Sequence, residues 1–360
     1  MLDDSLLDDT ERLASADGRA GGCLRAVASA GAQVRATQEA AAETGLAALA
    51  RDRPRALVIV TRPGVGPAVA QLLLALLPPT CPVPVVISED VPSWIGPLDV
   101  LLVHSDDPGD VQLAGSIDRA RRYGATVVIT AQAEGPVAAA AAGTVLLPPR
   151  IDLPVGFGYP RALSAGLILF DTLGLLRTDL GRLADELDRE AERDHASYES
   201  FVNPAKSLAL RIADHTPLLC GLDSVATAVG WHAAEVLAGF AGVVASNASY
   251  PQICGRRVLY RSAIGASAGA DIFADPDDAV PGGPRALLLS VTDDPQAVAN
   301  RLTATDDLPG ADLLQPAEET EGGAAVRAAV LALRFEMASV YLGLASGMLG
   351  GSGRYEPISA

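Results

Sequence analysis

Aromatic residues make up only 4% of the 360-residue sequence, whereas hydrophobic residues as a whole reach 49% and the mean hydropathy is +0.26. A large core can therefore form, and it must consist mainly of leucine, valine and alanine. A chain of this length is typical of two domains of ordinary size or of one large α/β body.

Basic residues are also scarce, because 27 lysines and arginines face 44 aspartates and glutamates, which gives a net charge of -17. Binding to nucleic acid needs a surface rich in lysine and arginine, so the composition argues against a nucleic-acid partner. A small anionic ligand remains compatible with this charge if a few cations gather at one place.

Cysteine is rare, and Cys23, Cys81, Cys220 and Cys254 lie far apart without a C-x-x-C motif. We interpret them as reduced thiols of a cytoplasmic protein, not as a disulfide framework or zinc ligands. The four histidines show no metal-ligand spacing, so we expect no metal and no cofactor. The acidic amino-terminal segment does not resemble a signal peptide, and apolar runs such as 68–77 are too short to span a bilayer, so no membrane partner is expected.

Short, almost continuously apolar runs follow a helical amino-terminal segment of residues 1–54. Such runs are typical of parallel strands that are buried on both faces. They occupy residues 56–60, 83–88, 99–105, 125–131 and 143–148. Helical stretches at 66–77 and about 108–122 separate several of them.

A second series of strand-like runs follows a helical region at 161–199, whose charged end is interpreted as a solvated connecting helix. These runs occupy residues 217–221, 243–246, 258–260, 286–292 and 311–316, and an apolar helix at 323–349 follows them. The pattern predicts an α/β fold with two domains, each a five-stranded parallel sheet flanked by helices. The expected segments are an amino-terminal helical segment (1–54), a first domain (55–152), connecting helices (153–206), a second domain (207–322), and a carboxyl-terminal helix and tail (323–360).

Ligands of such folds bind beyond the carboxyl ends of the strands, so the strand-to-helix turns are the candidate sites. Gly64 and Gly66 would let the backbone approach an anion at a helix N-terminus, although such glycines are often only structural. Ser105 and Gly109 belong to "SDDPGD", which is either a ligand loop or a helix cap whose aspartates would repel a phosphate.

Arg161 follows Pro160 at the start of a helix, where the macrodipole disfavours a cation. It either forms a surface salt bridge to nearby aspartates or points over the edge of the sheet to meet an anion.

The segment "LLCGLDSVATAVGWHAAEVLAG" (218–239) is the second candidate region. Asp223 or Ser224 can cap its helix, and Ser224 is a candidate ligand contact. His232 and Glu235 are three residues apart and share a helix face, so they are either an acid–base pair or a weak surface pair.

Several stretches together resemble the sugar isomerase (SIS) fold, and more closely the bifunctional phosphoglucose/phosphomannose isomerases of archaea and bacteria. The resemblance is carried by "LPVGFGYPRALSAGLILFDTLGLL", "NPAKSLALRIADHTPLLCG", "GWHAAEVLAG", "RFEMASVYLGLASG" and "DGRAGGCLRAVASAGAQV". It covers nearly the whole chain, and each motif is moderately specific.

The resemblance implies a homodimer that binds a sugar phosphate in a cleft between its domains and interconverts aldose and ketose phosphates through an enediol. Arg161 matches the arginine of that family, and it would steady the charge of the enediolate. His232 or Glu235 would then act as the base, with Gly64, Gly66, Ser105, Gly109 and Ser224 as candidate substrate contacts.

The catalytic motifs of the family are altered here. The first phosphate loop reads "GVGPA" and has no hydroxyl, Trp231 is followed by "HAAEVLAG", and Tyr250 and Gln252 replace the expected histidine and acid. Two alternatives to an isomerase therefore stay open: an inactive sugar-phosphate or nucleotide-sugar binding protein, and a structural or regulatory partner of a neighbouring enzyme.

Overall fold

The computed structural model describes residues 3–51, 53–268 and 283–349. The chain divides into two compact units, residues 29–185 and residues 1–28 with 186–359. Helix α9 (Leu180–Arg193) crosses the boundary between them along the chain.

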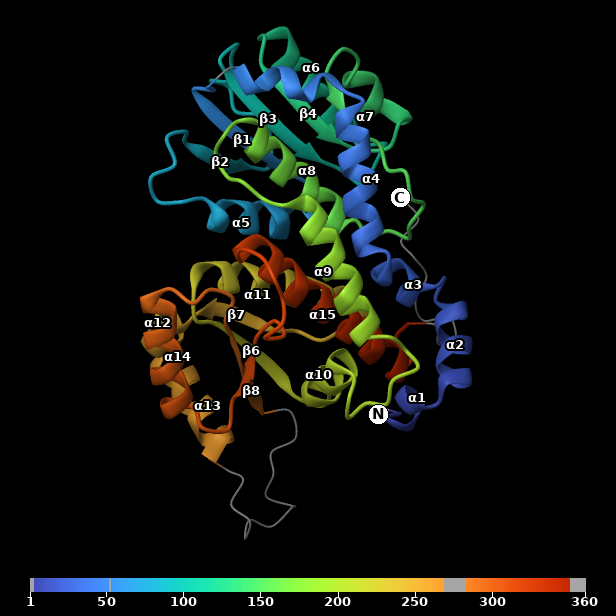
Figure 1. The fold of residues 1–360 in the computed structure, drawn as a ribbon, viewed down its shortest axis with the longest axis vertical. Coiled ribbons are helices and arrows are strands. Elements are labelled where there is room, and N and C mark those ends of the chain that lie inside the picture. Colours follow the sequence, from blue (N-terminus) through green and yellow to red (C-terminus); the bar gives the residue numbers. More distant parts are fainter. Residues whose placement is uncertain (1–2, 52, 269–282, 350–360) are drawn as a thin grey trace. The chain divides into compact units, whose positions relative to one another are not determined.

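The unit of residues 29–185 is built on a parallel sheet with strand order β2-β1-β3-β4-β5 (Figure 1). Its strands are β1 (Ala56–Thr61), β2 (Val85–Ser88), β3 (Asp99–His104), β4 (Thr126–Thr130) and β5 (Val145–Leu146). All five predicted strands of this half are confirmed. Every residue of β1 and β3 is buried, which explains why these runs are continuously apolar.

Helices cover both faces of this first sheet. Its helices are α4 (Ala30–Ala42), the 3-10 helix η1 (Gly45–Arg51), α5 (Gly66–Leu76), α6 (Val111–Arg122), α7 (Gly135–Ala140) and α8 (Tyr159–Thr172). Leu113 and Ile117 of α6 and Val137 of α7 pack on one face in a common core. On the other side, α5 and α8 pack so closely that a Cβ on Gly166 would lie 2.3 Å from Leu73 Cδ1.

The unit of residues 1–28 and 186–359 contains a parallel sheet with strand order β7-β6-β8-β9. Its strands are β6 (Thr216–Gly221), β7 (Ser246–Ser249), β8 (Pro284–Leu289) and β9 (Asp312–Leu314). The expectation of five strands is wrong for this sheet, which has four among the described residues. Residues 258–260 lie instead in helix α13 (Arg257–Ala268), because Leu259, Tyr260, Ala263 and Ile264 face the core at helical spacing while Val258 is 77% exposed.

The other helices of this unit lie before, between and after its strands. They are α1 (Ser5–Asp8), α2 (Thr10–Arg19), α3 (Cys23–Ala28), α10 (Pro204–Ile212), α11 (Ser224–Ala241), α12 (Tyr250–Gly255), α14 (Pro295–Asp307) and α15 (Ala324–Ala345). Helices α12, α13 and α14 share a core with one face of the sheet, while α11 packs on β6 and β7 and is itself in contact with α15. A Cβ on Gly343 of α15 would lie 2.2 Å from the carbonyl oxygen of Phe240, so this helix crossing depends on glycine.

Helix α15 differs from the expectation that the apolar runs are too short to span a bilayer. Its 22 residues are long and apolar enough to do so by length and composition, but all of its most apolar window is buried within the structure. We interpret it as the central packing helix of its unit.

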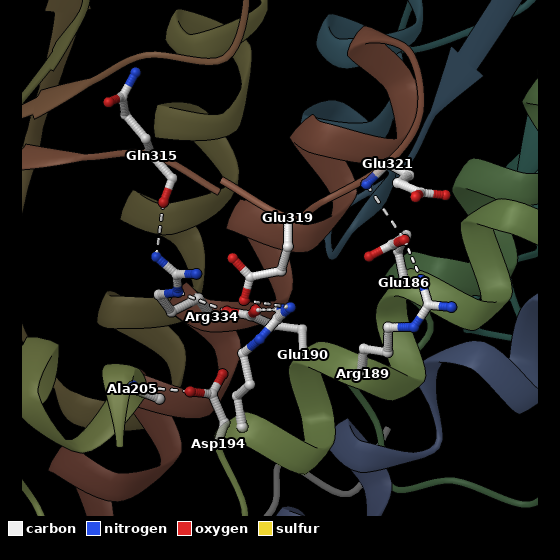
Figure 2. A network of polar contacts seen from close by, with 10 residues as sticks. Glu186, Arg189, Glu190, Asp194, Ala205, Gln315, Glu319, Glu321 and Arg334 are labelled. Atoms are coloured by element: carbon white, nitrogen blue, oxygen red, sulfur yellow. Dashed lines mark hydrogen bonds and ion pairs between the residues drawn. The ribbon is translucent and has the colours of Figure 1, made fainter. Parts of the chain in front are cut away.

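The charged end of the connecting region is not the fully solvated face that the sequence suggested. Glu186 and Glu190 of α9 and Asp194 just beyond its end follow one another at intervals of four residues, and each is 0% exposed. Figure 2 shows Glu190 and Asp194 near Arg334 of α15, whose Nε donates to Glu190 Oε1 at 2.6 Å. Glu186 instead accepts from Arg189 and from the backbone N–H of Glu321. Arg193 donates to the other Glu190 oxygen at 3.0 Å. These acidic side chains therefore belong to a buried ionic network, and the opposite face of α9 is exposed.

Candidate functional site

Three polar side chains meet where the central strands of the first sheet end. Thr61 of β1, His104 of β3 and Thr130 of β4 stand in register across the sheet. All three are buried, and His104 Nδ1 lies 2.6 Å from Thr130 Oγ1. This edge is where parallel α/β sheets place their ligands.

The loop after β3 is held by hydrogen bonds within itself. Ser105 donates its backbone N–H to Thr130 and its hydroxyl to the carbonyl oxygen of Asp107 at 2.9 Å. Asp107 Oδ1 in turn accepts from the backbone N–H of Gly109 at 2.8 Å. The hydroxyl of Ser105 is thus a donor within its own loop, and Gly109 closes the turn.

Asp110 ends this loop as the N-cap of α6. Its Oδ1 accepts from the Leu113 N–H at 2.8 Å, and its Oδ2 accepts from Arg62 Nε at 2.7 Å. The capping interpretation of "SDDPGD" therefore holds for Asp110, and Arg62 is engaged by that cap.

Arg161 points to the same edge from the first turn of α8. Its Nη2 donates to Asp106 Oδ1 at 2.9 Å, and Asp106 Oδ2 lies 3.3 Å from His104 Nε2. Arg161 is 8% exposed and its Nη1 has no hydrogen-bond partner, whereas the Asp106 side chain is 22% exposed. Both interpretations of Arg161 meet here: it lies at the carboxyl edge of the sheet, and the anion that it contacts is an aspartate.

The charges of this cluster depend on one another. Burial alone would raise the pKa of the Asp106 carboxyl, but the hydrogen bond with His104 and the charges of His104 and Arg161 hold that pKa below its ordinary value. Burial also lowers the pKa of Arg161, against the opposing effect of Asp106. Asp106 is therefore an ionised carboxylate at neutral pH.

The glycine turn after β1 borders the cluster. Gly64 has φ of +111°, a conformation that L side chains rarely adopt, and a Cβ placed on it would lie 3.8 Å from Asp106 Oδ2. Gly66 begins α5, and its backbone is close to Thr61. The carboxylate of Asp106 therefore faces the glycine turn that precedes α5.

The remaining candidate residues lie on α11, in the other unit. Asp223 is the N-cap, because it accepts from the Ala226 N–H at 2.7 Å, and Ser224 is the exposed first residue of the helix. His232 is 0% exposed, with its Nε2 3.1 Å from Oε1 of the buried Glu336 on α15. Glu235 is exposed. The two members of the expected acid–base pair therefore stand in different surroundings.

His104, Asp106 and Thr130 are not among the residues that the sequence predicts for the site. His104 and Thr130 end neighbouring strands, which is a usable signal, whereas the negative charge of Asp106 argues against phosphate binding. Within residues 3–51, 53–268 and 283–349, no group of three or more histidine, cysteine, aspartate or glutamate side chains is arranged to hold a metal ion.

The sequence matches no protein-family model and no curated protein. The structure is similar to solved structures, with TM-scores of 0.66 to a protein of Thermus thermophilus (12% identity, 98% of this chain and 92% of that one) and 0.60 to the tagatose-6-phosphate ketose/aldose isomerase of Escherichia coli (9%, 96% and 97%). The C-terminal domain of glucosamine-fructose-6-phosphate aminotransferase from Francisella tularensis also matches, with a TM-score of 0.60, 10% identity, and coverage of 90% of this chain and 96% of that one.

These similarities define the class of fold. The chain has the fold of phosphosugar isomerase (SIS-type) proteins, with parallel sheets flanked by helices. At such low identities the fold is what is shared.

Proposed function

We propose that this protein binds a sugar phosphate at the carboxyl edge of its first sheet. The observation that carries the proposal is Arg161, a guanidinium that is 8% exposed and whose buried Nη1 has no hydrogen-bond partner; its ion-pair partner Asp106 faces the glycine turn at Gly64. A buried cation with an unused donor can bind an oxygen-rich ligand such as a sugar. The similarity to a ketose/aldose isomerase acting on tagatose 6-phosphate supports this ligand class.

Aldose–ketose isomerisation is the second candidate function. It is favoured by the carboxylate of Asp106 and the imidazole of His104, which adjoin Arg161 and could move protons near an enediolate. This second candidate includes membership of the bifunctional phosphoglucose/phosphomannose isomerase family. In that case Glu235 or His232 would be the base and the protein would form a homodimer. The buried position of His232 makes the exposed Glu235 the better placed of the two for contact with a substrate.

Phosphorus NMR of fructose 6-phosphate with the purified protein tests both candidates, with a known isomerase as the positive control. Line broadening reports binding, and new signals of glucose 6-phosphate or mannose 6-phosphate report conversion. We expect broadening that is lost in Arg161→Ala and kept in Arg122→Ala, which removes an arginine 72% exposed on α6.

If conversion occurs, Arg161→Ala should slow it by roughly two orders of magnitude, because a donor to the developing oxyanion is lost. A spectrum that stays sharp with the wild-type protein would refute sugar-phosphate binding. Conversion that persists unchanged in Arg161→Ala would refute the role of this arginine.

A further inference from the structure

The carboxylate of Asp106 already occupies the side of Arg161 that a ligand phosphate would use. Asp106 Oδ1 accepts from Arg161 Nη2 at 2.9 Å, and the same carboxylate approaches the position of a Cβ on Gly64 to 3.8 Å. A phosphate in the turn at Gly64 would therefore have this carboxylate as a neighbour, and like charges in contact repel each other strongly.

The other charged side chains near the cluster do not offset this carboxylate. Arg62 is engaged by the helix cap Asp110, and Asp107 adds a second negative charge to the same loop. His104 supports Asp106 from behind, because its Nε2 lies 3.3 Å from Asp106 Oδ2 and its Nδ1 is fixed by Thr130. The carboxylate is thus held in place from two sides, by an imidazole and by a guanidinium.

A paired aspartate and arginine form a neutral unit with an acceptor and a donor side by side. The exposed part of Asp106 can accept from a ligand hydroxyl, and Arg161 Nη1, which is buried and without a partner, can donate to a neighbouring hydroxyl or carbonyl oxygen when the guanidinium turns toward the ligand. Adjacent oxygens of this kind are what the uncharged end of a sugar presents.

We propose that the Asp106–Arg161 pair determines ligand specificity: it binds the hydroxyl-bearing, uncharged part of the sugar and keeps anions away from Arg161. This inference rests on the proposed function for the identity of the ligand. Its central claim, that Asp106 blocks an anion site, can be measured separately.

The experiment compares wild type, Asp106→Asn and the double variant Asp106→Asn/Arg161→Gln by isothermal titration, with inorganic phosphate and with fructose 6-phosphate. Asparagine keeps the shape of aspartate but frees the guanidinium, so Asp106→Asn should bind inorganic phosphate at least about tenfold more tightly than wild type. The double variant should lose that gain. Asp118→Asn, which replaces a half-exposed aspartate paired with Arg122, is the matched control and should bind as wild type does.

In Asp106→Asn the preference for fructose 6-phosphate over inorganic phosphate should also fall by about tenfold or more. Circular dichroism checks folding, and Asp106→Ser is the second variant to use if Asp106→Asn does not fold. Phosphate affinity that is unchanged or weaker in a folded variant would overturn the inference, even if the wild type binds fructose 6-phosphate.

Wild-type protein that does not bind fructose 6-phosphate would instead refute the proposed function. A gain of phosphate binding in Asp106→Asn would still support the claim that the carboxylate blocks Arg161. The two failures therefore have different signatures.

Discussion

Arg334 is the residue whose replacement gives the sharpest test of the buried ionic network. It is 8% exposed, donates its Nε to Glu190 Oε1 at 2.6 Å and donates its Nη1 to the carbonyl oxygen of Gln315 at 2.8 Å (Figure 2). Arg334→Met keeps much of the apolar stem but leaves the fully buried Glu190 and Asp194 without this guanidinium.

The expected cost follows from these contacts. Removing one partner of a buried ion pair typically costs 3–5 kcal/mol, roughly, because the remaining charge stays desolvated. Arg193 still donates to Glu190 at 3.0 Å, so part of the compensation survives and the lower end of that range applies. We expect Arg334→Met to lower the free energy of unfolding by about 3 kcal/mol.

Urea unfolding followed by tryptophan fluorescence measures this loss. The chain has two tryptophans, so a Trp94→Phe background leaves Trp231, which lies in the same unit as Arg334. The control is Arg301→Met, which removes an ion pair to the 61% exposed Asp293 and should cost about 0–1 kcal/mol.

Adding Glu190→Gln to Arg334→Met should recover part of the loss, because the unpaired buried charge is then removed. A loss below about 1 kcal/mol in Arg334→Met, or a further loss on adding Glu190→Gln, would refute the reasoning.

Three further predictions concern the same unit. Burial and a neighbouring carboxylate raise the pKa of Asp194 well above its ordinary value of 3.8. The folded state therefore retains a proton on Asp194, and stability falls as pH rises through that raised pKa. Thermal melts of Asp194→Asn at several pH values should lose this dependence. Gly343→Ala should destabilise by about 1–3 kcal/mol or more through its clash with backbone, whereas Gly239→Ala, with nothing within 4 Å, should stabilise by up to about 1 kcal/mol in urea titrations. Lys206→Met should lower the free energy of unfolding by at least about 2 kcal/mol, because the buried ammonium donates to three backbone carbonyls. Urea titration measures this loss, and an unchanged urea midpoint would contradict that role.

The first sheet was readable from the sequence because its strands are buried on both faces. Residues 56–60 and 99–105 are almost continuously apolar. Short runs of this kind that are separated by helical patterns are typical of strands buried in a parallel sheet. Residues 258–260 were not readable in this way, because three apolar residues fit a strand and a helix equally well, and packing alone placed them in α13.

The position of Arg161 at the carboxyl edge of a sheet was also within reach of the sequence, since it follows from chain order and the geometry of parallel sheets. Its partner was not, because Asp106 lies 55 residues earlier in the chain, and several aspartates of the same loop were equally eligible. The choice between them depends on which carboxylate the fold of the loop aims inward, since Asp107 and Asp110 are used by local hydrogen bonds.

The sequence by itself determined the parallel α/β architecture, because local apolar patterns and turn residues act over a few positions. Tertiary structure alone decided which charges are buried. The acidic stripe of α9 has the composition of a solvated helix, and the packing of Arg334 against Glu190 is one of the contacts that make its burial tolerable. Such pairing joins residues more than a hundred positions apart, and local sequence carries no signal over that separation.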